Sequence, residues 1–205
     1  ISSQLHLDME AIKTALASRS KGAPRQEEEE IEWLSGIKDG ITLGTPIAFT
    51  IRNKNTRSED YELLREAFRP GHADYTYEAR YGIRDHRGGG RASARETVVR
   101  VVAGTIAQQL MPGISITTQV SDKPDHPDKP DTYGGIVSCR ITGLPAGIGD
   151  PVFGRLNAQL ANAMTTIPSA IGFEMGVGFK AAEMSGSEYI DRWNNVDIFN
   201  DDNSK

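Results

Sequence analysis

Residues 69–97 read RPGHADYTYEARYGIRDHRGGGRASARET, a stretch that combines a histidine, a glycine triplet and a run of arginines. The triplet at positions 88–90 permits positive φ angles and lets the backbone approach a ligand closely. Ser93 and Glu96 follow in the Ser-x-x-Glu spacing of a capping box, and apolar residues then recur every three or four positions as far as Leu110. We therefore predict a buried helix that begins just after the triplet.

The entrance to this helix is rich in positive charge. Seven arginines stand against four acidic residues between positions 69 and 100, although the whole chain has a formal net charge of −5. Unpaired N–H groups in the first turn of a helix attract anions, and Arg87, Arg91 and Arg95 could add charge-assisted hydrogen bonds. The pattern is typical of a phosphate-binding loop, but a glycine turn that merely joins two helices accounts for the spacing equally well.

His72 stands two residues before Asp74. Because histidine titrates close to neutral pH, His72 could transfer a proton or sit charged beside a phosphate-bearing ligand. A histidine that caps or packs a helix is the alternative interpretation. No pair of histidines in the chain has metal-ligand spacing, so we predict no metal site.

Composition predicts one globular domain over residues 1–205, since 38% of the positions are hydrophobic and 25% are charged. No apolar run approaches the roughly 18 residues that a membrane helix needs. Cys139 is the only cysteine, which excludes an intrachain disulfide and favours a reducing, cytoplasmic setting. The acidic net charge argues against general nucleic-acid binding.

The remaining patterns alternate between strand and helix, which predicts an α/β (α+β) fold. Residues 31–33 and 47–51 should form an antiparallel pair, with the Lys-Asp-Gly turn at 38–40 between them. The acidic run at 27–30 reads as a solvated surface without a chemical role. Asp150 and Pro151 are expected to start a helix. Other expected elements are helices at 9–19, 59–67 and 72–81, strands at 114–120 and 133–143, an extended glycine-rich stretch at 169–179, and a polar tail at 191–205.

Residues 68–104 resemble the signature region of the chorismate synthase family, with its Arg-Pro-Gly-His-Ala-Asp-Tyr-Thr-Tyr run and its Arg-Gly-Gly-Gly-Arg turn. The resemblance continues through LSGIKDGITLGTPIAFTIRN (34–53), GLPAGIGDPVFGRLNAQLANAM (143–164) and GFEMGVGF (172–179). It therefore runs along nearly the whole chain.

The resemblance implies a β-α-β sandwich with helices layered between antiparallel or mixed sheets. It also implies an enzyme of aromatic amino-acid biosynthesis, a lyase that catalyses the last step of the shikimate pathway. The reaction is the 1,4-anti elimination of phosphate from 5-enolpyruvylshikimate 3-phosphate to give chorismate, and it needs reduced FMN although no net redox change occurs. The family further implies a cytoplasmic homotetramer without nucleic-acid or membrane partners.

The resemblance also assigns individual positions. His72 matches a proton-donating histidine near the flavin, and Arg91, Ala92 and Ser93 match three FMN-contacting positions, with alanine in place of the usual serine at 92. A second FMN-contacting pair falls at residues 168 and 169. Arg19 and Arg25 match arginines that bind the substrate phosphate or NADP. The FMN set is therefore Arg91, Ala92, Ser93, Pro168 and Ser169.

Some family motifs have no counterpart in these 205 residues. The N-terminal Gly-Glu-Ser-His-Gly with its second histidine, the C-terminal glycine-rich segment and the Gly-Arg-His-Asp-Pro segment are absent, and the loop at 121–131 is short. The expectation is that the 205 residues alone are inactive. A non-catalytic module that binds a phosphorylated ligand or RNA, or an inactive fragment of the enzyme, remains the alternative.

Overall fold

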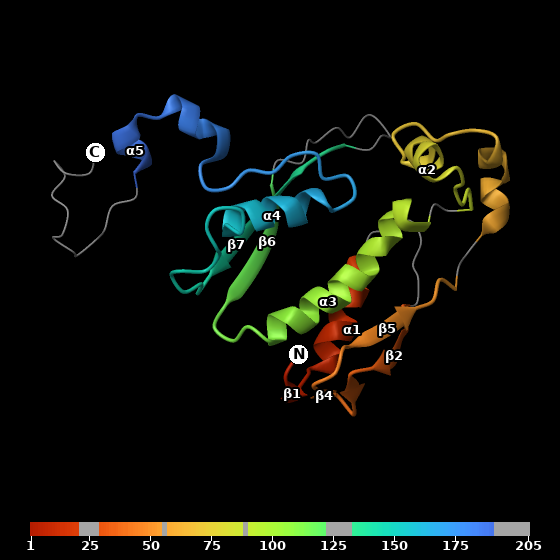
Figure 1. Cartoon of the computed structure of the whole chain (residues 1–205), viewed down its shortest axis with the longest axis horizontal. Coiled ribbons are helices and arrows are strands. Elements are labelled where there is room, and N and C mark those ends of the chain that lie inside the picture. The colour runs from red at the N-terminus through yellow and green to blue at the C-terminus, as the bar shows by residue number, and fades with distance from the viewer. Residues whose placement is uncertain (21–28, 55–56, 88–89, 122–132, 191–205) are drawn as a thin grey trace. The chain divides into compact units, whose positions relative to one another are not determined.

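The computed structural model describes residues 1–20, 29–54, 57–87, 90–121 and 133–190 (Figure 1). The chain divides into two compact units, Ile1–Ile148 and Gly149–Lys205, and each is described by itself. The single domain expected over residues 1–205 stays a prediction. None of the helices among the described residues has the length and apolar character needed to cross a bilayer.

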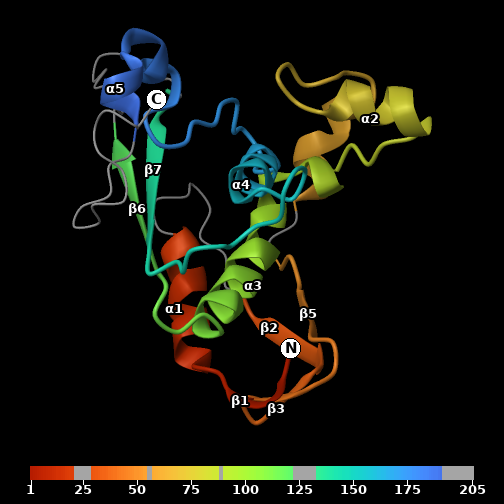
Figure 2. The ribbon, with the colours of Figure 1, turned by 60° about the vertical axis from the view of Figure 1, so that its left-hand side comes forward.

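The core of the first unit lies between helix α1 (Met9–Ser20) and helix α3 (Thr97–Gln109), which run side by side in both ribbon views (Figures 1 and 2). Both helices place apolar residues at three- and four-residue spacing toward each other, as their sequences predicted. Each buried aliphatic side chain contributes about 1.5–3 kcal/mol of transfer free energy. The buried apolar residues are Leu7, Ile12, Leu16, Val98, Val102 and Ile106.

Polar contacts fix the start of α1. The backbone N–H of Ala11 donates to Oδ1 of Asp8 at 2.9 Å, so Asp8 caps the helix. The side-chain amide of Gln109, at the end of α3, pairs with both backbone groups of Asp8. The end of α3 is thereby tied to the beginning of α1.

Two small antiparallel sheets accompany the helices. Strand β2 (Ile31–Ser35) pairs with β5 (Ala48–Ile51), with Trp33 opposite Phe49, as predicted. The expectation that the Lys-Asp-Gly turn joins these strands was wrong: it joins β3 (Ile37–Lys38) to β4 (Ile41–Leu43), in a sheet of order β1-β4-β3 with β1 (Ser3–His6). The chain turns at Gly36, where φ is +82° and a side chain would lie 2.6 Å from a backbone oxygen.

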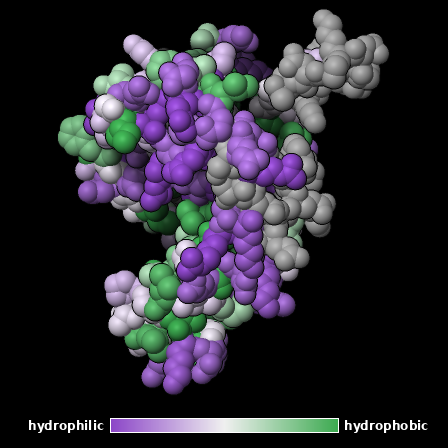
Figure 3. All heavy atoms as spheres, turned by 90° about the vertical axis from the view of Figure 1, so that its right-hand side faces the viewer, coloured by the Kyte–Doolittle hydropathy of each residue, from purple (hydrophilic) through white to green (hydrophobic). Residues whose placement is uncertain are grey.

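The segment before α3 is built from short helices. A 3-10 helix, η1 (Ser58–Arg65), replaces the α-helix expected at 59–67. Helix α2 (Asp74–Tyr81) ends as predicted at Gly82, where φ is +70°. It begins two residues later than expected, because the backbone of His72 closes a turn onto Arg69. Figure 3 views the side of the molecule that carries η1 and α2, where most side chains are hydrophilic.

Two further 3-10 turns, η2 (Gly90–Ala92) and η3 (Ala94–Glu96), lead into α3. Only half of the predicted capping box forms. Ser93 accepts a hydrogen bond from the backbone of Arg95 at 3.2 Å, whereas Glu96 lies within ion-pair distance of Arg91 and Arg100 instead of reaching back to Ser93. The α-helix consequently starts at Thr97 and not at the cap.

The first unit continues into an antiparallel hairpin of β6 (Ser115–Ser121) and β7 (Ile136–Thr142), as predicted. The second unit holds α4 (Leu156–Thr165), η4 (Gly178–Glu183) and α5 (Gly186–Tyr189). Asp150 does not start a helix, because it forms an isolated bridge with Gly154. The stretch expected to be extended at 169–179 runs into η4, and the tail at 191–205 lies outside the described residues.

Candidate functional site

The predicted FMN-contacting loop forms the η2 turn at the entrance to α3. Gly90 adopts a φ of +48°, and a side chain built there would meet nothing within 4 Å, so the turn needs glycine for its backbone conformation. The other two glycines of the triplet, at 88 and 89, lie outside the described residues. Of the three glycines predicted to surround a phosphate, the structure therefore describes Gly90 alone.

The three family-matched residues of this loop differ in exposure. The side chain of Arg91 is 79% exposed, and its guanidinium lies 3.8 Å from the carboxylate of Glu96. Ala92 and Ser93 are half-buried. The Ser93 oxygen accepts a hydrogen bond from the backbone of Arg95, which leaves its hydroxyl proton to donate. The loop thus offers one exposed cation and one hydroxyl donor two positions apart in sequence.

Behind this loop two arginines converge on one buried carboxylate. Arg19, in the last turn of α1, donates from Nη1 to Oε1 of Glu29 at 2.7 Å, and from Nε to Oγ1 of Thr97 at 3.3 Å. Arg95 approaches the same Glu29 oxygen to 3.5 Å. The Glu29 side chain is only 1% exposed. Burial, together with the positive charge of Arg19, lowers the pKa of Arg95. We call Arg19, Glu29 and Arg95 the arginine cluster; its formal charge is +1.

The arginine cluster corrects one expectation from the sequence. The acidic run at 27–30 was predicted to be a solvated surface, yet the carboxylate of Glu29 is buried between two guanidiniums. Glu30, next to it, does behave as predicted, since its side chain is 76% exposed and pairs with Lys54 at 2.8 Å. No local pattern distinguishes the two neighbours, because the partners of Glu29 are distant in sequence.

A second polar cluster surrounds His72. Asp74, a buried residue, accepts hydrogen bonds from the Arg69 side chain at 2.7 and 2.9 Å and from the Arg69 backbone at 3.2 Å. These bonds hold the pKa of Asp74 well below its usual range. Nδ1 of His72 lies 3.0 Å from the same carboxylate, which is within ion-pair distance. The two groups are not aligned for a hydrogen bond. A carboxylate whose ionised form is favoured by Arg69 therefore lies against one edge of the imidazole.

Other arginines of the positively charged segment have structural partners. Arg84 donates from Nη2 to three backbone carbonyls at the end of η1, those of Leu64, Arg65 and Ala67, at 2.6 to 3.1 Å. Its guanidinium also lies 4.9 Å from the centre of the Phe68 ring. Arg87, which was a candidate anion ligand, donates to Asp85 at 3.1 Å. Much of the local positive charge thus holds the segment together.

The predicted site residues do not all meet. Among the described residues, no hydrogen bond, ion pair or ring contact joins His72 to Arg91, Ala92 or Ser93. Pro168 and Ser169 belong to the second unit, where they follow α4 and Ser169 adopts a φ of +68°. Arg25 lies outside the described residues. No described residues form a group of three or more metal-ligating side chains.

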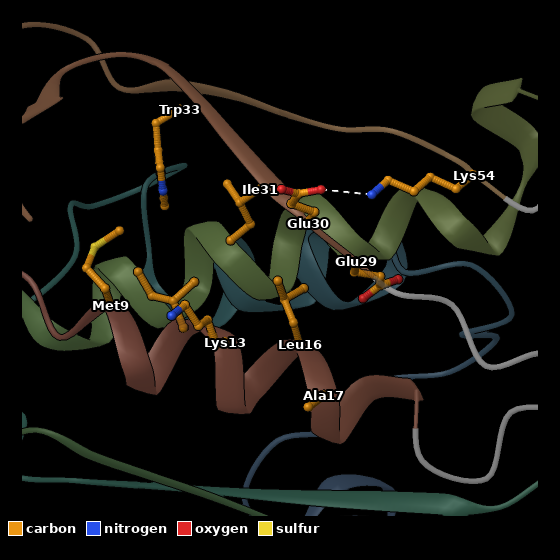
Figure 4. Close-up of a pocket in the computed structure, with 10 residues that line it drawn as sticks. Met9, Lys13, Leu16, Ala17, Glu29, Glu30, Ile31, Trp33 and Lys54 are labelled. Atoms are coloured by element: carbon orange, nitrogen blue, oxygen red, sulfur yellow. Dashed lines mark hydrogen bonds and ion pairs between the residues drawn. The ribbon is translucent and has the colours of Figure 1, made fainter.

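A hollow of about 610 Å³ lies between α1 and β2 (Figure 4). Apolar side chains from the two elements form its walls, and the ion pair of Glu30 with Lys54 lies along one side. The hydrogen bond from Lys54 lowers the pKa of Glu30. None of the residues predicted from the sequence to bind a ligand lines this hollow. The lining residues are Met9, Ile12, Lys13, Leu16, Ala17, Glu29, Glu30, Ile31, Trp33 and Lys54.

Comparison with known proteins gives one consistent family. The family model described as chorismate synthase matches residues 1–125 and 124–204. The chorismate synthase of Opitutus terrae is 42% identical over 91% of this chain and 64% of the relative. Those of Flavobacterium psychrophilum and Parabacteroides distasonis are 41% and 43% identical, over 92% and 93% of this chain and 65% and 66% of the relatives. The chain thus spans about two thirds of their length.

The fold agrees with the sequence matches. A crystal structure of chorismate synthase superimposes with a TM-score of 0.74 and 26% sequence identity, covering 94% of this chain and 67% of the other. The expected mixed α/β class with antiparallel sheets is confirmed by this match and by the sheets described above.

Proposed function

The chain belongs to the chorismate synthase family, and on this premise we propose that the protein is a lyase that eliminates phosphate from 5-enolpyruvylshikimate 3-phosphate to form chorismate. The same premise supports a place in aromatic amino-acid biosynthesis and a cytoplasmic homotetramer. Two parts of the reaction need residues that this chain supplies: recognition of a phosphorylated substrate and transfer of a proton.

The observation that carries the proposal is the arginine cluster. Arg19 and Arg95 together hold two positive charges, and Glu29 neutralises one of them. The side chains of both arginines are partly buried, at 24% and 20% exposed, so water screens them less than it screens a fully exposed cation. Each charge-assisted hydrogen bond to a phosphate contributes about 1.5–3 kcal/mol. The cluster is therefore suited to hold the phosphate group of the substrate and to stabilise it as it departs.

We assign proton transfer to His72. Its Nδ1 edge faces Asp74, so Nε2 is the ring nitrogen that can exchange a proton with a ligand. Arg69 keeps Asp74 ionised and fixed by three hydrogen bonds, and a fixed anion on one side of an imidazole orients the ring. Arg69 and Asp74 act as positioning residues in this scheme, because Arg69 holds Asp74 and Asp74 lies against the ring of His72.

The η2 loop fits the phosphate end of a flavin. Arg91 is exposed beside a glycine turn with open space around it, and the Ser93 hydroxyl can donate to an anion. Ala92 brings a backbone amide but no hydroxyl. We propose that Arg91, Ala92 and Ser93 bind FMN, with Pro168 and Ser169 as a second contact. When bound, reduced FMN supplies the electron-rich partner that the family's reaction requires without net redox change.

An anaerobic turnover assay tests the proposal. The full-length protein is mixed with reduced FMN and 5-enolpyruvylshikimate 3-phosphate, and released phosphate and chorismate are measured. We expect both products in equal amounts with no net oxidation of the flavin. His72→Ala should lower kcat by about 10²–10⁴-fold, the usual contribution of a general acid. His86→Ala, a histidine of the same segment near Glu62, is the matched control. Absence of phosphate release from the full-length protein would overturn the assignment.

A further inference from the structure

We propose that Glu29 is a positioning residue for phosphate recognition: its buried carboxylate holds Arg19 of α1 and Arg95 of the α3 entrance so that both guanidiniums can bind the same phosphate group. The inference rests on the proposed function. It concerns a residue that lies in an unremarkable acidic run of the sequence and matches no motif identified above.

The geometry makes Glu29 the link between two distant segments. Arg19 and Arg95 lie 76 positions apart in sequence, and one oxygen of Glu29 lies 2.7 Å from the first and 3.5 Å from the second. Each guanidinium also contacts one neutral acceptor, Thr97 Oγ1 for Arg19 and the Arg52 carbonyl for Arg95. The Glu29 carboxylate is the contact that the two arginines share.

Electrostatics explains why the shared group must be an anion. Two guanidiniums close to the same atom repel each other, and burial strengthens that repulsion. Burial and the charge of Arg19 already lower the pKa of Arg95. Replacing the carboxylate by a neutral amide of the same shape would leave the repulsion uncompensated, and the two cations would separate. A single phosphate could then no longer be reached by both.

Glu29 cannot itself bind the phosphate, because it is negatively charged and its side chain is only 1% exposed. Its effect must act through the two arginines, and this distinguishes positioning from a general structural role. Loss of positioning weakens only ligands that carry a phosphate. General damage to the packing of α1 on α3 weakens every ligand of the site.

The test compares two ligands and three variants of the full-length protein. Dissociation constants are measured for 5-enolpyruvylshikimate 3-phosphate and for the same compound without its phosphate, in the wild type and in Glu29→Gln, Glu29→Asp and Glu30→Gln. Glu30→Gln removes the same charge one residue away, from an exposed pair with Lys54. Thermal unfolding of each variant shows whether it is folded.

For Glu29→Gln we expect the phosphorylated ligand to bind at least about ten-fold more weakly, as expected when a charge-assisted contact is lost. The dephosphorylated ligand should bind as in the wild type, and Glu30→Gln should change neither constant. Glu29→Asp keeps the charge but is one methylene shorter, so a smaller loss of about three-fold, again confined to the phosphorylated ligand, is expected.

Three results would contradict the inference: an unchanged preference for the phosphorylated ligand in Glu29→Gln, equal weakening of both ligands, or an equal effect of Glu30→Gln. If Glu29→Gln does not fold, the same comparison is made with Glu29→Asp. Positioning is then refuted if Glu29→Asp does not weaken the phosphorylated ligand selectively. Failure of the wild type to bind either ligand would instead refute the proposed function.

Discussion

Replacing Asp74 by asparagine should destabilise the protein by about 3 kcal/mol at pH 7. The change removes the charge from a buried side chain and turns one acceptor oxygen into an N–H donor that faces the guanidinium of Arg69. Removing one partner of a buried ion pair typically costs about 3–5 kcal/mol. The lower end applies here, because the Arg69 side chain is 24% exposed and water can partly solvate it when it is left unpaired.

The contribution of Asp74 to stability should depend on pH. The pKa of Asp74 is lower in the folded protein than in the unfolded chain, where an aspartate titrates near about 3.9. The ionised carboxylate therefore stabilises the fold above that pH, and the contribution is lost as the pH falls through the depressed folded pKa. Between pH 7 and pH 3 the free energy of unfolding should fall more in the wild type than in Asp74→Asn. The difference in free energy of unfolding between the two proteins should therefore be smaller at pH 3 than at pH 7.

Urea-induced unfolding at pH 7 and at pH 3 measures this difference. Asp85→Asn is the matched control, because it makes the same chemical change at a pair with Arg87 whose side chains are 53% and 58% exposed. Exposed pairs contribute little, so a clearly smaller loss is expected. The reasoning fails if the two substitutions destabilise equally, or if the effect of Asp74→Asn is the same at both pH values.

Two further predictions concern the framework of the site. Ile12→Ala should lower the free energy of unfolding, measured in urea, by about 2–5 kcal/mol, because Ile12 of α1 is 0% exposed in the core. Leu63 is 89% exposed, so Leu63→Ala should change the free energy of unfolding by less than about 0.5 kcal/mol. Similar losses at both positions would contradict the assigned core. Arg84→Lys should raise the rate of backbone amide hydrogen exchange in η1. A single ammonium cannot replace the guanidinium, which contacts three carbonyls and Glu78. An unchanged exchange rate would show that these contacts do not stabilise η1.

Much of the fold could be predicted because its signals are local. Asp8 at the start of α1, Gly82 at the end of α2 and the alternating strands each depend on a few neighbouring residues. The helix expected from Asp150 begins only at Leu156, because Asp150 pairs with Gly154 and the intervening residues form a turn that the proline signal does not reveal. The capping box at Ser93 failed in part because Glu96 lies between two arginines.

The site was harder to predict, because its organising contacts join distant segments. The sequence indicated His72 by its residue type and surroundings and Arg19 through the family resemblance, but nothing near Glu29 reveals that Arg19 and Arg95 enclose it. Arg84, in contrast, added to the apparent positive charge of the segment although its guanidinium serves η1. The number of charges along a sequence does not distinguish cations that can bind a ligand from cations that pair with groups of the chain itself.

The central claim is that the arginines around the α3 entrance recognise phosphorylated compounds, and a comparison of two flavins tests it most directly. The full-length protein is titrated anaerobically with reduced FMN and with reduced riboflavin, which differ only in the phosphate. If the claim is right, FMN binds at least about ten-fold more tightly, in line with one charge-assisted contact, and Arg91→Ala reduces that preference. Equal affinity for the two flavins would contradict it.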